Sequence, residues 1–119
     1  MNRMQQITLG AGAAVLAALS AAALAHHGWS GYETQLRKVS GTIDEASYAN
    51  PHASIRLKAS DKTWVVVLAP PSRMSSRGLT AEMLKVGTSA SVEGYQNMTK
   101  ESEMRAERIS LNGKMVELR

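Results

Sequence analysis

The chain has 119 residues, enough for one small domain, and a formal net charge of +4 at pH 7. This positive charge is mild and dispersed, so it does not indicate nucleic acid or an anionic membrane as the partner. The chain contains no cysteine, which excludes disulfides, thiolate metal sites, a cysteine nucleophile and a lipid-bearing cysteine.

Residues 1–25 have the three parts of a cleavable secretory signal peptide. Arg3 supplies the positive start, an apolar stretch rich in Ala, Val and Leu follows from Ile7, and Ala23-Leu24-Ala25 forms a cleavage site. Cleavage after Ala25 would make His26 the first mature residue, and cleavage after Ala23 is the alternative. The apolar stretch is too short and too rich in alanine for a stable span. We therefore expect a periplasmic or secreted protein without stable membrane insertion after cleavage.

The mature chain is predicted to consist of a polar leader segment, residues 26–37, and a β-barrel domain, residues 38–119. The first half of that domain shows three strands. Val39–Tyr48 and Ala53–Ala59 alternate apolar and polar residues, which is typical of strands with one buried face. Asn50-Pro51 marks the turn between them. Thr63–Ala69 is almost entirely apolar and β-branched, which predicts a strand covered on both faces.

The second half begins with a helical linker and ends with a hairpin. Pro70-Pro71 ends the third strand, and Ser72 and Thr80 are predicted to cap short helical turns over 72–77 and 81–85. Strands are predicted over 88–95, 106–111 and 114–118, with the last two joined at Asn112-Gly113. The apolar parity before this turn is irregular, which predicts a β-bulge or a late strand start. The order indicates a mostly β, OB-like barrel of five to six strands, with a short helical segment between strands three and four.

Several motifs of the mature chain resemble those of a family of small exported bacterial proteins of unknown function. The matching pieces are Ala25-His26-His27 with Trp29, Asn50-Pro51-His52, Trp64, Gly78-Leu79-Thr80 with Leu84 and Gly87, and Val92 with Gly94. Gly28 stands where that family often has serine. The resemblance implies an exported, barrel-like β domain and supplies no activity.

The three histidines of the chain, His26, His27 and His52, all lie within these motifs. Imidazole is the commonest metal-binding side chain near neutral pH. If His26 is the mature N-terminus, its amine and imidazole could chelate Cu(II) together with the imidazole of His52, while His27 could replace either histidine. Met98 and Met104 could add a thioether ligand for Cu(I). The sequence therefore suggests a periplasmic copper-binding accessory protein.

The alternative is a non-catalytic envelope module that binds a ligand or another protein without metal. Barrels of this kind bind oligosaccharides or oligonucleotides through aromatic and basic side chains. Such a face could be formed by Tyr48, Trp64, Tyr95, Arg56 and Lys58. Export argues against nucleic acid and leaves a glycan or an envelope protein as the partner. No catalytic triad spacing, phosphate-binding loop or nucleophile elbow is present, so we do not expect an enzyme.

Overall fold

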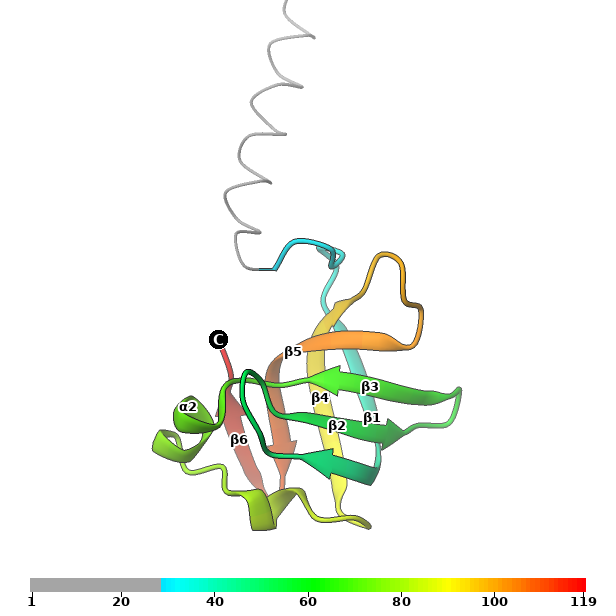
Figure 1. Cartoon of the computed structure of the whole chain (residues 1–119). Coiled ribbons are helices and arrows are strands. Elements are labelled where there is room, and N and C mark those ends of the chain that lie inside the picture. Colours follow the sequence, from blue (N-terminus) through cyan, green and yellow to red (C-terminus); the bar gives the residue numbers. More distant parts are fainter. Residues whose placement is uncertain (1–28) are drawn as a thin grey trace, which may run out of the picture. The chain divides into compact units, whose positions relative to one another are not determined.

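The computed structural model describes residues 29–119, of which Gly31–Arg119 form one folded unit. The predicted signal peptide and residues 26–28 lie outside the described residues. Figure 1 shows the strands and the helical linker of the folded unit, which are β1 (Arg37–Ser47), β2 (Ser54–Lys58), β3 (Thr63–Val67), α2 (Pro71–Ser76), a 3₁₀ turn (Ala81–Leu84), β4 (Ser89–Gln96), β5 (Glu103–Leu111) and β6 (Lys114–Glu117). Within residues 29–119, no helix has the length and apolar character needed to cross a membrane.

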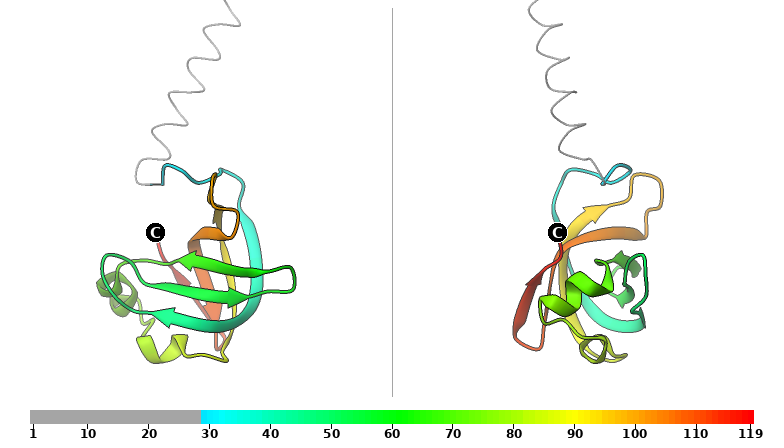
Figure 2. Two further views of the ribbon diagram at one scale, coloured as in Figure 1. Left: turned by 45° about the vertical axis from the view of Figure 1, so that its right-hand side comes forward. Right: turned by 60° about the vertical axis from the view of Figure 1, so that its left-hand side comes forward.

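The sheet closes into a barrel because β5 pairs with two strands besides β6. The strand order is β3-β2-β1-β4-β5-β6, and β3 also pairs with β5 in parallel. All other strand pairs are antiparallel. Five strands therefore form a closed mixed barrel with β6 as an added strand (Figures 1 and 2). This arrangement, with α2 between β3 and β4, confirms the predicted OB-like fold.

The core consists of the inward residues of the strands together with apolar residues of the helical linker. Its largest fully buried side chains include Trp64, Ile43, Ile55, Leu57, Leu68, Met74, Leu79, Leu84, Met104 and Ile109. The prediction that β3 is covered on both faces is wrong. Trp64 and Val66 are buried, whereas Val65 and Val67 on the outer face are only partly buried. A closed barrel has a single interior, so each strand buries one face fully.

A β-bulge divides β5 into two parts that pair with different neighbours. The partner of Glu93 is Arg108 and the partner of Gly94 is Ala106, so Glu107 is the extra residue. An extra residue bends a strand, and Figure 1 shows β5 running beside β3 before it turns towards β6. The predicted bulge is confirmed, although β5 begins at Glu103, before the predicted strand start at residue 106.

The helical linker forms where it was expected, but its predicted serine cap is wrong. α2 begins at Pro71, so Ser72 lies inside the first turn, and Pro70 holds the capping position without a side-chain bond. Proline suits this first position because its missing N–H would have no partner there. Thr80 holds the capping position of the 3₁₀ turn, yet its side chain makes no capping hydrogen bond.

The described part of the leader packs against the end of β4. Tyr32 forms an isolated bridge with Asn97, and the Glu33 amide donates to the Gln96 carbonyl at 2.8 Å. The Met98 amide donates to the Gly31 carbonyl at 2.7 Å. The fold therefore begins several residues before the predicted domain boundary at residue 38.

Gly94 is predicted to be essential for the bend of β5. A Cβ atom at this position would lie 2.1 Å from the Arg105 carbonyl oxygen and 2.8 Å from the Ala106 Cα. Because backbone atoms cannot move aside cheaply, Gly94→Ala should lower the free energy of unfolding by about 1–3 kcal/mol in urea. Ser89→Ala, at an exposed position of the same strand, is the control. Equal stability of the two variants would contradict this view of the bend.

Candidate functional site

His52 lies on the loop that joins β1 to β2, and backbone bonds hold it beside the end of β3. The next residue, Ala53, donates to the Ala69 carbonyl at 2.9 Å and accepts from the Leu68 amide at 2.8 Å. These bonds continue the β2–β3 pairing beyond both strands. The Asn50–Pro51 peptide bond that precedes His52 is cis. The imidazole is partly buried, so it remains accessible from one side.

Arg105 reaches His52 from β5. Its neighbours in sequence, Met104 and Ala106, are fully buried, so Arg105 lies on the outer face of the barrel. The parallel pairing places Arg105 opposite Val67, near the end of β3. Its Nη2 atom lies 3.4 Å from Nε2 of His52. Closure of the barrel thus joins two side chains that are 53 residues apart in the sequence.

We assign Arg73 of α2 to this site as its third member, because its charge acts on the other two. The helix begins shortly after Ala69, the partner of Ala53, so the linker returns the chain to the His52 loop. One guanidinium nitrogen of Arg73 donates to the Leu118 carbonyl at 3.1 Å. The charge of Arg73 lowers the pKa of both other members. We refer to His52, Arg73 and Arg105 as the cationic corner.

The electrostatics of the corner favour a neutral imidazole. Burial, followed by the charges of Arg105 and Arg73, lowers the pKa of His52 below 6.5. Burial is also the first cause that lowers the pKa of Arg105, while the hydroxyl of Tyr32 opposes this shift. Guanidinium groups nevertheless stay protonated in proteins. At neutral pH the corner therefore holds two fixed positive charges beside an uncharged histidine.

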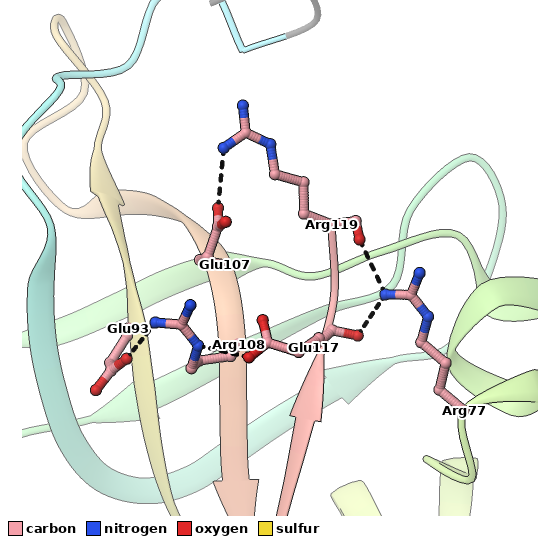
Figure 3. A network of polar contacts seen from close by, with 6 residues as sticks. All are labelled: Arg77, Glu93, Glu107, Arg108, Glu117 and Arg119. Carbon is pink, nitrogen blue, oxygen red and sulfur yellow. Dashed lines mark hydrogen bonds and ion pairs between the residues drawn. The ribbon is translucent and has the colours of Figure 1, made fainter. Parts of the chain in front are cut away.

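Three acidic side chains of β4, β5 and β6 pair with other arginines (Figure 3). Arg108 contacts Glu93 at 2.5 Å and Glu117 at 2.8 Å, and Arg119 contacts Glu107 at 3.3 Å. Arg77, the residue that follows α2, donates to the backbone oxygens of Glu117 and Arg119 at 2.7 and 3.0 Å, which ties the end of the helix to the end of β6 (Figure 3). The ion pairs of residues 29–119 do not include Arg73.

The described residues contain only part of the predicted metal site. His26 and His27 lie outside residues 29–119, so their distance to His52 stays a prediction. Met104 is fully buried in the core and Met98 is 66% exposed, so only the Met98 thioether is accessible to a ligand at the surface. No group of three or more histidine, cysteine or acidic side chains that could hold a metal ion occurs in the described part.

The predicted aromatic and basic face is also wrong. Trp64 is 1% exposed and points into the core opposite Leu57. Arg56 and Lys58 alternate with buried residues of β2 and face solvent. Adjacent residues on a strand point to opposite sides of the sheet, so the indole and the basic groups cannot share a face.

The two remaining aromatic residues of that predicted face have separate environments. The hydroxyl of Tyr48 donates to the Leu79 carbonyl at 2.7 Å. Tyr95 is partly exposed on β4, in register with Arg105 on β5. Tyr95 lies apart from Arg56 and Lys58, because β1 separates β2 from β4 in the sheet.

Tyr32 links the leader to the strand that carries Arg105. Its hydroxyl donates to the Glu103 carboxylate at 2.7 Å, and the Asn97 amide donates to the same oxygen at 2.7 Å. Burial, together with the hydrogen bond to Glu103, raises the pKa of Tyr32 to about 12. The charge of Arg105 acts in the opposite direction.

Sequence reasoning found His52 and missed Arg73 and Arg105. Neither arginine belongs to a recognisable motif. Arg73 lay in a segment interpreted only as a helical turn, and Arg105 lay at the irregular start of the last hairpin. The sequence predicted a barrel but not its strand register, so it could not show that these two arginines lie near His52.

The lowered pKa of His52 predicts how stability depends on pH. The unfolded chain takes up this proton more readily than the folded chain, so the stabilising contribution is complete above pH 6.5 and is lost as the pH falls through the lower folded value. Between pH 7.5 and 5.5 the wild type should therefore lose more stability than His52→Gln, as measured by urea unfolding. Parallel pH profiles would contradict the lowered pKa. His26 and His27 are present in both proteins, so their contributions to the pH dependence of stability cancel in the comparison.

Comparison with known proteins identifies a family for this chain and a solved structure to which it is similar. No curated protein matches this chain. One solved structure, a crystal structure of TiaS in complex with an isoleucine tRNA and ATP, contains a chain that is 15% identical, with a TM-score of 0.47. That likeness covers 65% of this chain and only 18% of the other, so this chain spans less than a fifth of its length. A family of unknown function, DUF6152, matches residues 13–105, which confirms the expectation of an uncharacterised family. The chain belongs to DUF6152.

Proposed function

We propose that this protein is an exported, non-catalytic binding module that holds an envelope glycan at the cationic corner. The observation that supports this most is the approach of Arg105 to His52, with 3.4 Å between Nη2 and Nε2. Three different elements, the β1–β2 loop, α2 and β5, each contribute one polar side chain to this place. Their backbones are fixed by barrel closure and by the Ala53–Ala69 bonds. A preorganised set of donors suits a binding role.

The position of the corner in the fold supports a glycan ligand. Barrels of the OB type bind oligosaccharides and oligonucleotides at strands 2 and 3 and at the loops beside them, including the loop between strands 1 and 2. His52 lies on this loop, and Arg105 lies beside β3. Because the predicted signal peptide directs the chain out of the cytoplasm, a glycan of the envelope is the ligand that we favour over nucleic acid.

The surroundings of His52 support binding over catalysis. A histidine that acts as a general base is usually oriented by a carboxylate and contacts a nucleophile. The hydrogen-bond contact of His52 within the described chain is to a guanidinium group, which can only donate. Two arginine charges also lower the pKa of this imidazole. These features make His52 a poor base at neutral pH and a suitable hydrogen-bonding group.

The proposal predicts that envelope oligosaccharides perturb the corner. The isotope-labelled protein, recovered from the periplasm with its N-terminus determined by sequencing, would be titrated with peptidoglycan and lipopolysaccharide oligosaccharides. Amide resonances of residues 52–54, 67–69 and 105 should shift together by NMR. Arg105→Gln should weaken binding, whereas Arg56→Gln, a charge-matched change at an exposed position of β2, should not. Shifts confined to other surfaces, or no shifts, would contradict the proposal.

Copper binding through His26 and His52 is the second candidate function. It is supported by the position of Tyr32, whose hydroxyl donates to Glu103, two residues before Arg105 on the same strand. The few residues between His26 and Tyr32 can span up to ~20 Å, which is long enough for His26 to approach this region. The nearby guanidinium groups oppose it, because they repel a metal cation at His52.

A Cu(II) titration separates the two candidates. If copper is the ligand, protein with a native His26 terminus should bind one equivalent more tightly than micromolar. An extra residue before His26 and the His52→Ala substitution should each weaken that binding. Absence of stoichiometric binding to the native terminus, or binding unaffected by His52→Ala, would overturn the copper candidate and leave the glycan proposal intact.

A further inference from the structure

We propose that a second copy of this chain docks on the outer face of β1, β4, β5 and β6, related to the first by a two-fold axis. This docking face consists of two rows of side chains, each with one residue from every strand: Lys38, Glu93, Arg108 and Glu117, and then Ser40, Ser91, Ser110 and Met115. The docking face lies after the bulge of β5, whereas Arg105 of the cationic corner lies before it. The inference is therefore independent of the proposed glycan binding.

The strand register aligns each row across the sheet. Lys38 lies opposite Glu93, and the pairing continues through Arg108 to Glu117. The row that begins with Ser40 lies two residues away along each strand. The residues between the two rows are buried, and they are Val39, Val92, Ile109 and Val116. Because adjacent residues on a strand point to opposite sides of the sheet, both rows point outward.

The first row alternates in charge across the sheet. Figure 3 shows Arg108 between two carboxylates, with contacts of 2.5 Å to Glu93 and 2.8 Å to Glu117. Lys38 is exposed and belongs to none of the ion pairs in the part of the chain that the structure describes. The side chain of Glu117 is 56% exposed. The row therefore has an accessible cation at its β1 end and an accessible carboxylate at its β6 end.

A row of four alternating charges is complementary to itself in one orientation. A two-fold axis that runs along the strands, between β4 and β5, reverses the order of the row in the second copy. Lys38 then faces Glu117 of the second copy, and Glu93 faces Arg108 of the second copy. An axis across the strands would instead set Lys38 against its own counterpart, and like charges at an interface oppose association. A two-fold dimer uses the same patch on both copies, so each favourable pair occurs twice.

The same axis makes the second row complementary in shape. Met115, at the β6 end, is 62% exposed. Near the other end the face is hollowed, and small residues that include Ser40, Thr42, Ser89 and Ser91 line this hollow. Reversal of the row sets Met115 of one copy against Ser40 of the other. An exposed apolar side chain thus enters a hollow, and removal of its surface from water favours association.

The width of the docking face predicts a weak dimer. Neighbouring strands lie about 4.8 Å apart, so the four strands span only ~14 Å from β1 to β6. A face of this width buries less than the ~1,200 Å² at which specific, stable interfaces begin. We therefore expect a transient dimer that forms at micromolar or higher protein concentration.

The outer edge of β6 is the competing surface for a second copy. An unpaired strand edge can add a strand from another chain. Arg77 already donates to the backbone oxygens of Glu117 and Arg119 at 2.7 and 3.0 Å, so part of this edge is occupied. Edge pairing would use main-chain hydrogen bonds and would not depend on Lys38. The observations favour the docking face, and the edge becomes an outcome of the test.

Charge reversal at the two ends of the first row tests the dimer. In sedimentation equilibrium of the full exported protein, Lys38→Glu and Glu117→Lys should each weaken self-association at least tenfold, because each sets like charges face to face. An equimolar mixture of the two variants should associate as the wild type does, because every facing pair then joins opposite charges. Lys58→Glu, at an exposed position of β2, is the charge-matched control and should leave the dissociation constant within twofold.

A methionine pair tests the second row without changing charge. Met115→Ser should weaken self-association at least tenfold, because the hollow then receives no apolar side chain. Met98→Ser should leave it within twofold, since Met98 has a similar exposure of 66% but lies on the β4–β5 loop. Thermal unfolding of every variant checks the fold, and this pair keeps the test decisive if a charge variant does not fold.

Four results would overturn the inference. The wild type could stay monomeric up to about 1 mM, a concentration at which even weak complexes form. Association unaffected by Lys38→Glu would assign the dimer to the edge of β6, and an equal loss in Lys58→Glu would show a general effect of net charge. Failure of the mixed variants to associate would exclude the proposed axis. None of these results bears on the glycan titrations, so the proposed function is tested separately.

Discussion

The parallel pairing of β3 with β5 is the constraint on which the rest of the structure depends. The Val65 amide donates to the Ser102 carbonyl at 2.7 Å, and three residue pairs follow in register, ending with Val67 and Arg105. This short contact converts an open sheet into a barrel. It also brings Arg105 to His52 from the far end of the sequence. Without closure the core would be open on one side, and the two side chains would belong to distant strands.

The bend of β5 makes this closure possible, and it links the fold to the candidate site. Glu107 bulges where β5 leaves β3, and Gly94 leaves room for the backbone of β5 to pass closely. The leader adds to this arrangement, because Tyr32 binds Glu103 at the start of the same strand. Fold and candidate site are therefore coupled, since Arg105 itself forms the last of the three residue pairs that close the barrel.

The sequence predicted the local elements well and the convergence of the site poorly. Alternation placed β1, β2 and β4 nearly at their observed bounds, and Asn112-Gly113 located the last hairpin, because these signals depend on neighbouring residues. The start of β5 was missed because polar Glu103 and Arg105 lie on its outer face and resemble a loop. His52 was singled out by its chemistry and its turn. Its partners could not be identified, because the register that unites them is set by tertiary pairing alone.

The most direct test of the account is the pKa of His52, measured by NMR titration of its imidazole in the wild type and in Arg105→Gln. Burial and the two neighbouring guanidinium groups should place the wild-type value below 6.5, and removal of the Arg105 charge should raise it. An unchanged value would show that Arg105 does not face His52 in solution. That result would contradict both the closure that joins the two residues and the function built on it.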